Sequence, residues 1–235
     1  MLECRDIVLR REGWEFTADL DLQPGGRIAV IGPSGAGKTT LLSLIAGFLA
    51  PDAGRIAWQG RDLTGIAPGK RPVSVLFQDQ NLFPHLDVTR NVGLGLRPDL
   101  RLSPDQRDRV AQAIADVGLG GFGDRLPANL SGGQQSRVAL ARVLLRARPI
   151  LLLDEPFAAL GPALKSEMME LLDRIGRDTG ALMLMVTHDP RDALEFARQT
   201  IVVQDGHCQP PQATGDLLRD PPPALREYLG GSIGG

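Results

Sequence analysis

The sequence predicts an α/β fold with a mostly parallel sheet, and three observations lead to this prediction. Residues 150–153 and 181–186 are unbroken apolar runs bounded by polar residues, which is typical of strands covered on both faces. Residues 27–48 have the pattern of a strand, a glycine-rich turn and a helix. Between about 84 and 148 the apolar residues take helical spacing, which predicts an inserted helical subdomain.

Further elements follow from local patterns along the chain. Residues 16–22 alternate apolar and polar, which predicts a half-buried strand, and the segment 24–26 predicts a turn. Short strands are also expected at 55–59 and 73–77. The Asp-Gly pair at 205–206 predicts a hairpin, whereas the Pro/Gly-rich tail after Gln209 is expected to pack loosely.

Four helices are expected, and apolar residues at helical spacing indicate three of them. The first presents Leu41, Leu42, Leu44, Ile45 and Phe48. The second lies in the inserted segment and presents Val110, Ile114 and Val117, and another helix follows residues 130–134. The third carries a stripe of Leu164, Met168, Leu171, Leu172 and Ile175, in which we interpret the methionine as core packing.

Composition limits the classes of protein that the chain fits. Its 26 basic and 28 acidic residues among 235 give a formal charge of −2, which indicates no general affinity for nucleic acid or anionic lipid. Cys4 and Cys208 lie near opposite ends without metal-ligand or redox spacing, so we predict no disulfide and a reducing compartment. The N-terminus has no secretory pattern, and the apolar-rich run 39–51 is too short to cross a bilayer.

The glycine-rich turn matches the pattern G-x-x-x-x-G-K-[ST], which binds phosphate. Glycines let the backbone wrap around phosphate oxygens, so that N–H groups and the start of the helix bind them. Lys38 is expected to reach the β and γ phosphates, and Thr39 is expected to bind magnesium. The pattern alone leaves kinases, GTPases and ATPases open. The expected phosphate-binding residues are Gly32, Pro33, Ser34, Gly35, Ala36, Gly37, Lys38, Thr39 and Thr40.

Polar side chains end the strands that follow, where open α/β sheets bind ligands. Asp154 ends the apolar run 150–153 and is a candidate magnesium ligand, and Glu155 is the candidate that deprotonates the attacking water. His188 ends the run 181–186 and is a candidate contact for the γ phosphate or that water. Gln78 ends the strand at 73–77, where its amide oxygen is a candidate magnesium ligand.

A second anion-binding candidate lies at residues 130–134, which read LSGGQ. Ser131 is the expected N-cap of the following helix, and Gly132 and Gly133 leave backbone N–H groups open to an anion. Gln134 completes the motif. Ser-Gly-Gly alone more often forms a turn. The full five-residue match indicates anion binding here because the chain also carries the phosphate-binding turn.

Together these motifs resemble the nucleotide-binding subunits of ATP-binding cassette (ABC) transporters, and the resemblance covers nearly the whole chain. The matching features are GPSGAGKTT as Walker A, Gln78 as the Q-loop, LSGGQ as the signature, ILLLDE as Walker B and His188 as the switch histidine. The resemblance implies a P-loop NTPase fold with an N-terminal antiparallel β subdomain. It divides the single domain 1–235 into a core (1–83 and 149–210), a helical signature subdomain (84–148) and a tail (211–235).

The resemblance also implies cofactors, partners and a location. ATP and Mg²⁺ bind between two copies of the chain paired head to tail, each copy facing its partner's signature helix. The implied partners are an integral membrane permease and, indirectly, a periplasmic substrate-binding protein, with the chain at the cytoplasmic face of the inner membrane. Leu82, Phe83 and Leu86 are candidate permease contacts, with subdomain core as the alternative.

Within the family, the text KRPVSVLFQDQNLFPHL and the short length are most similar to the ATPases of bacterial thiamine importers. The expected function is therefore the ATP-hydrolysing motor of an importer for thiamine and its phosphate esters. The alternatives are another small-solute cargo, such as a polyamine, iron or molybdate, a nucleic-acid-associated ABC ATPase, or a cassette that binds ATP without hydrolysing it.

Two departures from the family pattern stand out. Where relatives read Ser-Ala-Leu-Asp after Walker B, this chain has Ala158 and Gly161 at the first and last positions, so it lacks a carboxylate that helps couple the two sites. The usual adenine-stacking tyrosine is also missing. We take Trp14 as the candidate for that role and Phe16 as a core residue.

Overall fold

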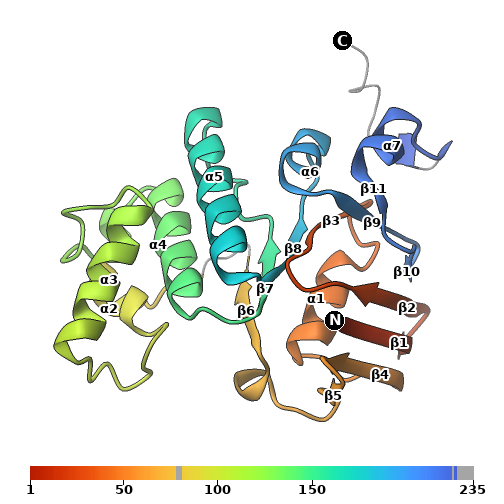
Figure 1. The fold of residues 1–235 in the computed structure, drawn as a ribbon, viewed down its shortest axis with the longest axis horizontal. Helices are drawn as coiled ribbons and strands as arrows, with labels where there is room; N and C mark the ends of the chain where they lie inside the picture. The colour runs from red at the N-terminus through yellow and green to blue at the C-terminus, as the bar shows by residue number, and fades with distance from the viewer. Residues whose placement is uncertain (78–80, 224, 227–235) are drawn as a thin grey trace.

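The computed structural model describes residues 1–77, 81–223 and 225–226 (Figure 1). Its strands form one extended sheet in the order β5-β4-β1-β2-β10-β9-β3-β8-β7-β6, with β11 pairing β9. The antiparallel strands lie at one end of the molecule and a group of helices lies at the other (Figure 1). This arrangement agrees with the α/β fold class expected from the sequence.

The antiparallel part contains β1 (Leu2–Arg11), β2 (Trp14–Leu22), β4 (Ala53–Trp58) and the short β5 (Arg61–Asp62). Strand β1 is absent from the sequence-based expectation. Its apolar residues alternate with charged ones only until the register shifts between Cys4 and Ile7, where Asp6 adopts a positive φ of 48°. This bulge breaks the period of two that would have revealed the strand.

The parallel part contains five strands in the order β9-β3-β8-β7-β6. Both β7 and β8 are buried along their whole length, which confirms the interpretation of the two apolar runs. Their pairing places Asp154 opposite Val186, and β3 pairs with both β8 and β9. The five strands are β3 (Arg27–Ile31), β6 (Val73–Leu76), β7 (Ile150–Asp154), β8 (Leu182–Val186) and β9 (Gln199–Gln204).

Helix α1 (Lys38–Ala46) packs between the antiparallel strands and the parallel strands. Its leucines and Ile45 join a core that includes Phe16 from β2 and Leu184 from β8. The expectation for Phe48 is wrong. The helix ends at Gly47, which adopts a left-handed φ of 86°, and the chain therefore turns before Phe48, whose exposed fraction is 53%.

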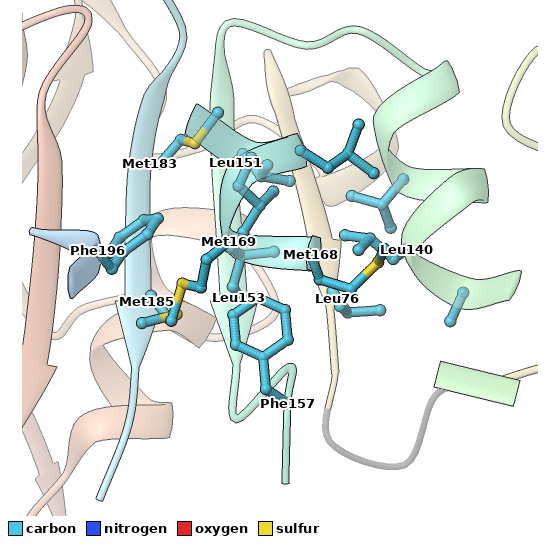
Figure 2. Close-up of a cluster of buried hydrophobic side chains, with 14 of the residues drawn as sticks. Leu76, Leu140, Leu151, Leu153, Phe157, Met168, Met169, Met183, Met185 and Phe196 are labelled. Carbon is cyan, nitrogen blue, oxygen red and sulfur yellow. The ribbon is translucent and has the colours of Figure 1, made fainter. Parts of the chain in front are cut away.

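The helices on the other face enclose a second core (Figure 2). Met168, Met183 and Met185 are all buried there, which confirms that the methionines serve packing. Helices α2, α3 and α4 contact one another and lie within residues 84–148. The helices of this face are α2 (Val88–Gly93), α3 (Pro104–Asp116), α4 (Gly132–Leu145), α5 (Pro162–Thr179) and α6 (Pro190–Phe196).

The chain after β9 first forms the expected hairpin, because β10 (His207–Cys208) pairs antiparallel with β9 across Asp205 and Gly206. The expectation that the following tail packs loosely is wrong for its described part. Strand β11 (Gln212–Ala213) pairs with β9, and α7 (Thr214–Arg219) buries Leu217 and Leu218 against the core. Apolar burial by this short helix outweighs the local Pro and Gly content.

Short 3₁₀ helices also connect these elements, among them η1 (Pro68–Lys70) and η2 (Pro127–Asn129). Cys4 and Cys208 are both buried as free thiols. Within the described ranges, the structure contains no helix with the length and apolar character needed to span a bilayer.

Candidate active site

The glycine-rich loop between β3 and α1 requires glycine at two positions. Gly32 has a φ of 151°, and a Cβ atom there would lie 1.9 Å from the carbonyl oxygen of Val203 on β9. Gly37 has a φ of 111°, and a Cβ atom there would lie 2.8 Å from the ring of Phe16. Any larger side chain would therefore displace the loop from the sheet or strain its backbone.

Lys38 is the first residue of α1, and its side chain folds back over the loop. Its ammonium group donates hydrogen bonds to the carbonyl oxygens of Gly32 and Pro33 at 2.7 and 2.8 Å. Partial burial lowers the pKa of Lys38, although Glu155 and Asp154 act in the opposite direction. The cation is thus held at the rim of the loop, where an anion bound by the loop would meet it.

Thr39 and Asp154 meet although 115 positions separate them in the sequence. The Thr39 hydroxyl donates a hydrogen bond of 3.1 Å to a carboxylate oxygen of Asp154 at the end of β7. The pKa of Asp154 is raised, mainly because the side chain is buried and also because of the negative charge of Glu155. The hydrogen bond from Thr39 and the positive charge of Lys38 act in the opposite direction. A hydroxyl oxygen and a carboxylate oxygen therefore lie side by side at the start of α1.

Glu155 follows Asp154 in a left-handed backbone conformation, with a φ of 46° that is unusual for a residue with a side chain. Its backbone N–H donates to the carbonyl oxygen of Val186 on β8 at 3.2 Å. Its carboxylate lies 3.4 Å from Nδ1 of His188, whose side chain is 63% exposed. The two side chains thus face each other across the ends of β7 and β8.

The structure therefore brings together Lys38, Thr39, Asp154, Glu155 and His188 at the carboxyl ends of β3, β7 and β8. These strands are neighbours in the sheet, so residues far apart in the sequence meet at one edge. Gln78, the remaining candidate from the strand ends, lies outside the described residues.

The signature motif belongs to the helical group and not to this edge. Ser131 is the N-cap of α4, as expected, and it forms a reciprocal capping box with Gln134 through hydrogen bonds of 3.3 and 2.9 Å. A Cβ atom at Gly133 would lie 3.2 Å from Leu160, so the motif packs beside the segment that follows Glu155. Helices α4 and α1 lie on opposite sides of β6 and β7 (Figure 1).

Trp14 lies beside the loop, as a stacking role requires. A Cβ atom at Gly37 would lie 3.2 Å from the Trp14 ring, which is partly exposed. Phe16 is fully buried, which confirms its assignment to the core, and its ring centre lies 5.9 Å from that of Trp14. Trp14 is thus the outer ring of an aromatic pair that supports the loop.

Sequence patterns did not reveal a charged cluster beside His188. Lys165 on α5 forms ion pairs with Asp189, the residue directly after His188, and with Asp192, four residues after it. The partners are 24 and 27 positions from Lys165, and no motif spacing connects them. Only the packing of α5 against α6 brings them together.

A glycine-rich loop that opens a helix after a buried strand, faced by carboxylates at neighbouring strand ends, defines a P-loop nucleotide-binding protein. Comparison with known families agrees: the model described as ABC transporter matches residues 17–158. The chain belongs to the ABC transporter family.

Relatives and solved structures resemble most of the chain. A protein named Thiamine import ATP-binding protein ThiQ from Cereibacter sphaeroides is 61% identical, with coverage of 98% of this chain and 100% of that protein. A protein of the same name from Ruegeria sp. is 55% identical with the same coverage. The ATP-binding cassette MJ0796, solved as a dimer in a post-hydrolysis state bound to ADP and Pi, superposes with a TM-score of 0.82. It is 27% identical, with coverage of 91% of this chain and 99% of that one.

Proposed function

We propose that the chain is the ATP-hydrolysing motor subunit of an importer for thiamine and its phosphate esters. The observation that carries the ATPase part is the meeting of the loop lysine, the Thr39–Asp154 pair and the Glu155–His188 pair at one sheet edge. The cargo is inferred from relatives that are named for thiamine import and share 48–61% identity with this chain.

ATP binds with its phosphates in the loop from Gly32 to Thr40, where backbone N–H groups and the start of α1 meet the negative charge. Lys38 exchanges its two carbonyl acceptors for phosphate oxygens, because a charge-assisted hydrogen bond is stronger than a neutral one. Trp14 stacks on the adenine.

The residues beside the loop suit Mg²⁺, which prefers oxygen ligands. Thr39 and Asp154 present a hydroxyl and a carboxylate within 3.1 Å of each other, so this donor set fits the ion. Gln78 is the third candidate ligand and lies outside the described residues. Thr39 and Asp154 would hold the ion, which would supply positive charge against the phosphates of ATP.

Glu155 acts as the general base that accepts a proton from the attacking water. Its left-handed backbone and its hydrogen bond to Val186 fix the carboxylate at the end of the sheet. His188 lies 3.4 Å away, where it orients the carboxylate and contacts the γ phosphate. Positioning of this kind contributes to the rate because the base is held within reach of the water before reaction.

Two copies of the chain pair head to tail, so that the signature residues Ser131, Gly132, Gly133 and Gln134 of each copy cover the ATP of the other. Two observations support this pairing. The signature start of α4 lies apart from the loop within one chain (Figure 1), and the similar cassette MJ0796 was solved as a dimer.

The membrane permease docks beside the helical subdomain 84–148, and a periplasmic binding protein delivers cargo to it. The chain is then peripheral, at the cytoplasmic face of the inner membrane, and no nucleic acid takes part. Of the candidate contacts, Phe83 is 46% exposed, whereas Leu82 is half-buried against the core and Leu86 is intermediate. Phe83 is therefore the favoured permease contact.

Uptake of labelled thiamine at nanomolar concentration tests this function in the host. We expect deletion of the gene to abolish uptake, the native chain to restore it, and Lys38→Ala to fail, because the loop loses the cation that meets the phosphates. Lys70→Ala, a change at an exposed lysine on η1, is the control and should restore uptake fully.

Either of two results would change the proposal. Unchanged uptake after deletion would remove thiamine as the cargo, and the same assay with a polyamine, iron or molybdate would follow. Restoration of uptake by Lys38→Ala would instead contradict the role of the loop lysine.

Trp14 is tested through the chain's own fluorescence, since Trp14 and the buried Trp58 are its two tryptophans. We expect ATP to quench the native signal. Titration calorimetry measures the affinity of the variants, and Trp14→Ala should weaken ATP binding about tenfold, the effect of losing one base-stacking contact. Trp14→Tyr should retain most of the affinity. Equal affinity in native protein and Trp14→Ala would exclude the stacking role.

A further inference from the structure

His188 has little packing of its own to hold it in place. Its side chain is 63% exposed, and its ring faces Glu155 across 3.4 Å. The backbone dihedral angles determine which rotamers are open to an exposed ring and where each of them places it. The position of the histidine therefore depends on its neighbours in the chain.

Both neighbours of His188 are held by one cluster of hydrogen bonds. The Thr187 hydroxyl donates to Asp192 at 3.2 Å and accepts from the backbone N–H of Asp189 at 3.1 Å. The Asp189 carboxylate caps α6 by accepting from the N–H of Arg191 at 2.9 Å. The cluster thus closes a tight loop around the histidine.

Lys165 links this cluster to the segment that carries Glu155. It lies in the first turn of α5, which begins seven residues after Glu155, and its ammonium group pairs with Asp192 and with Asp189, the latter at 3.3 Å. The side chains of Lys165 and Asp192 are only 23% and 10% exposed, so water screens the pair weakly.

The Glu155 segment and the His188 segment both line a cavity of about 130 Å³, and Lys165 lines it as well. Side-chain packing between the two segments is therefore incomplete. Without the lysine, the carboxylates of Asp189 and Asp192 would lose the cation that pairs with both of them, and their mutual repulsion would favour opening of the loop.

We propose that Lys165 is a positioning residue that ties the loop bearing His188 to the helix that follows Glu155, and so holds the two reacting side chains at their working separation. It acts through His188 and does not touch ATP. This inference rests on the proposed hydrolysis of ATP by Glu155.

Steady-state ATP hydrolysis by the full chain is the first test, with Lys165→Met, Lys165→Arg and the exposed control Lys70→Met. We expect Lys165→Met to lower kcat about tenfold with KM for ATP within about twofold, because positioning affects the reaction and not binding. Lys165→Arg should stay within about threefold of native kcat because it keeps the cation. Asp192→Asn should resemble Lys165→Met.

NMR of the histidine rings is the second test and does not depend on turnover. The chain has three histidines, His85, His188 and His207, and the His188→Asn spectrum assigns the ring in question. In Lys165→Met we expect the His188 signals to move toward those of the denatured chain while the other two stay unchanged, which also reports that the variant is folded. Lys165→Arg should restore the native signals.

The proposal stands if kcat falls and the His188 signals move together. It is overturned if either changes alone, or if neither changes in a native chain that hydrolyses ATP. A folded native chain that does not hydrolyse ATP, alone or with its membrane partner, would instead contradict the proposed function. The NMR result would still show whether Lys165 holds the loop that carries His188.

Discussion

Glu155→Gln is expected to lower the rate of ATP hydrolysis by about 10² to 10⁴, because the amide cannot accept the proton of the attacking water. Gln has nearly the shape of Glu and tolerates the positive φ at this position to a similar degree, so the backbone at the end of β7 should not change. ATP binding through the loop should persist. Bound ATP would then accumulate between two copies of the chain.

The measurement combines single-turnover hydrolysis with size-exclusion chromatography in the presence of ATP and Mg²⁺. Glu170→Gln, an exposed change on α5, is the matched control and should hydrolyse ATP at the native rate as a transient dimer. Hydrolysis at the native rate by Glu155→Gln would remove Glu155 as the base. Absent hydrolysis in the native chain would favour a cassette that only binds ATP.

Arg71 is expected to give the largest loss of stability of any polar side chain described here. The residue is 1% exposed, and its guanidinium donates to four backbone carbonyl oxygens at 2.8 to 3.1 Å, two of them at the end of α1. These acceptors are the carbonyl groups of Leu44, Ile45, Thr64 and Ile66. The side chain thereby satisfies the last turn of the helix that begins at the glycine-rich loop.

Arg71→Ala leaves buried carbonyl groups without donors and opens a cavity. We therefore expect the free energy of unfolding to fall by more than about 3 kcal/mol. For a domain of this size the melting temperature should fall by about 6 to 12 °C. Thermal unfolding by circular dichroism measures the shift. Arg61→Ala, at an exposed arginine on β5, should change it little, and a similarly small shift for Arg71→Ala would show that water replaces the lost donors.

Apolar periodicity in the sequence was sufficient to predict a strand or helix where one face, or the whole element, is buried along its length. The apolar runs at 150–153 and 181–186 became β7 and β8, and the stripe through Met168, Leu171 and Leu172 became the buried face of α5. Strand β1 was not predicted because its bulge breaks the alternation of apolar and polar residues. Helix α7 was not predicted because Pro and Gly flank its two buried leucines.

By itself the sequence determined the phosphate-binding loop, the family and the polar residues that follow β7 and β8, because these depend on local motifs and on short-range apolar patterns. Only the tertiary structure decided which of those residues meet. The contact between Thr39 and Asp154, the two hydrogen bonds from Arg71 to the end of α1 and the pairing of Lys165 with Asp192 join segments that are distant in the chain. Such contacts follow from strand order and helix packing, which no local pattern encodes.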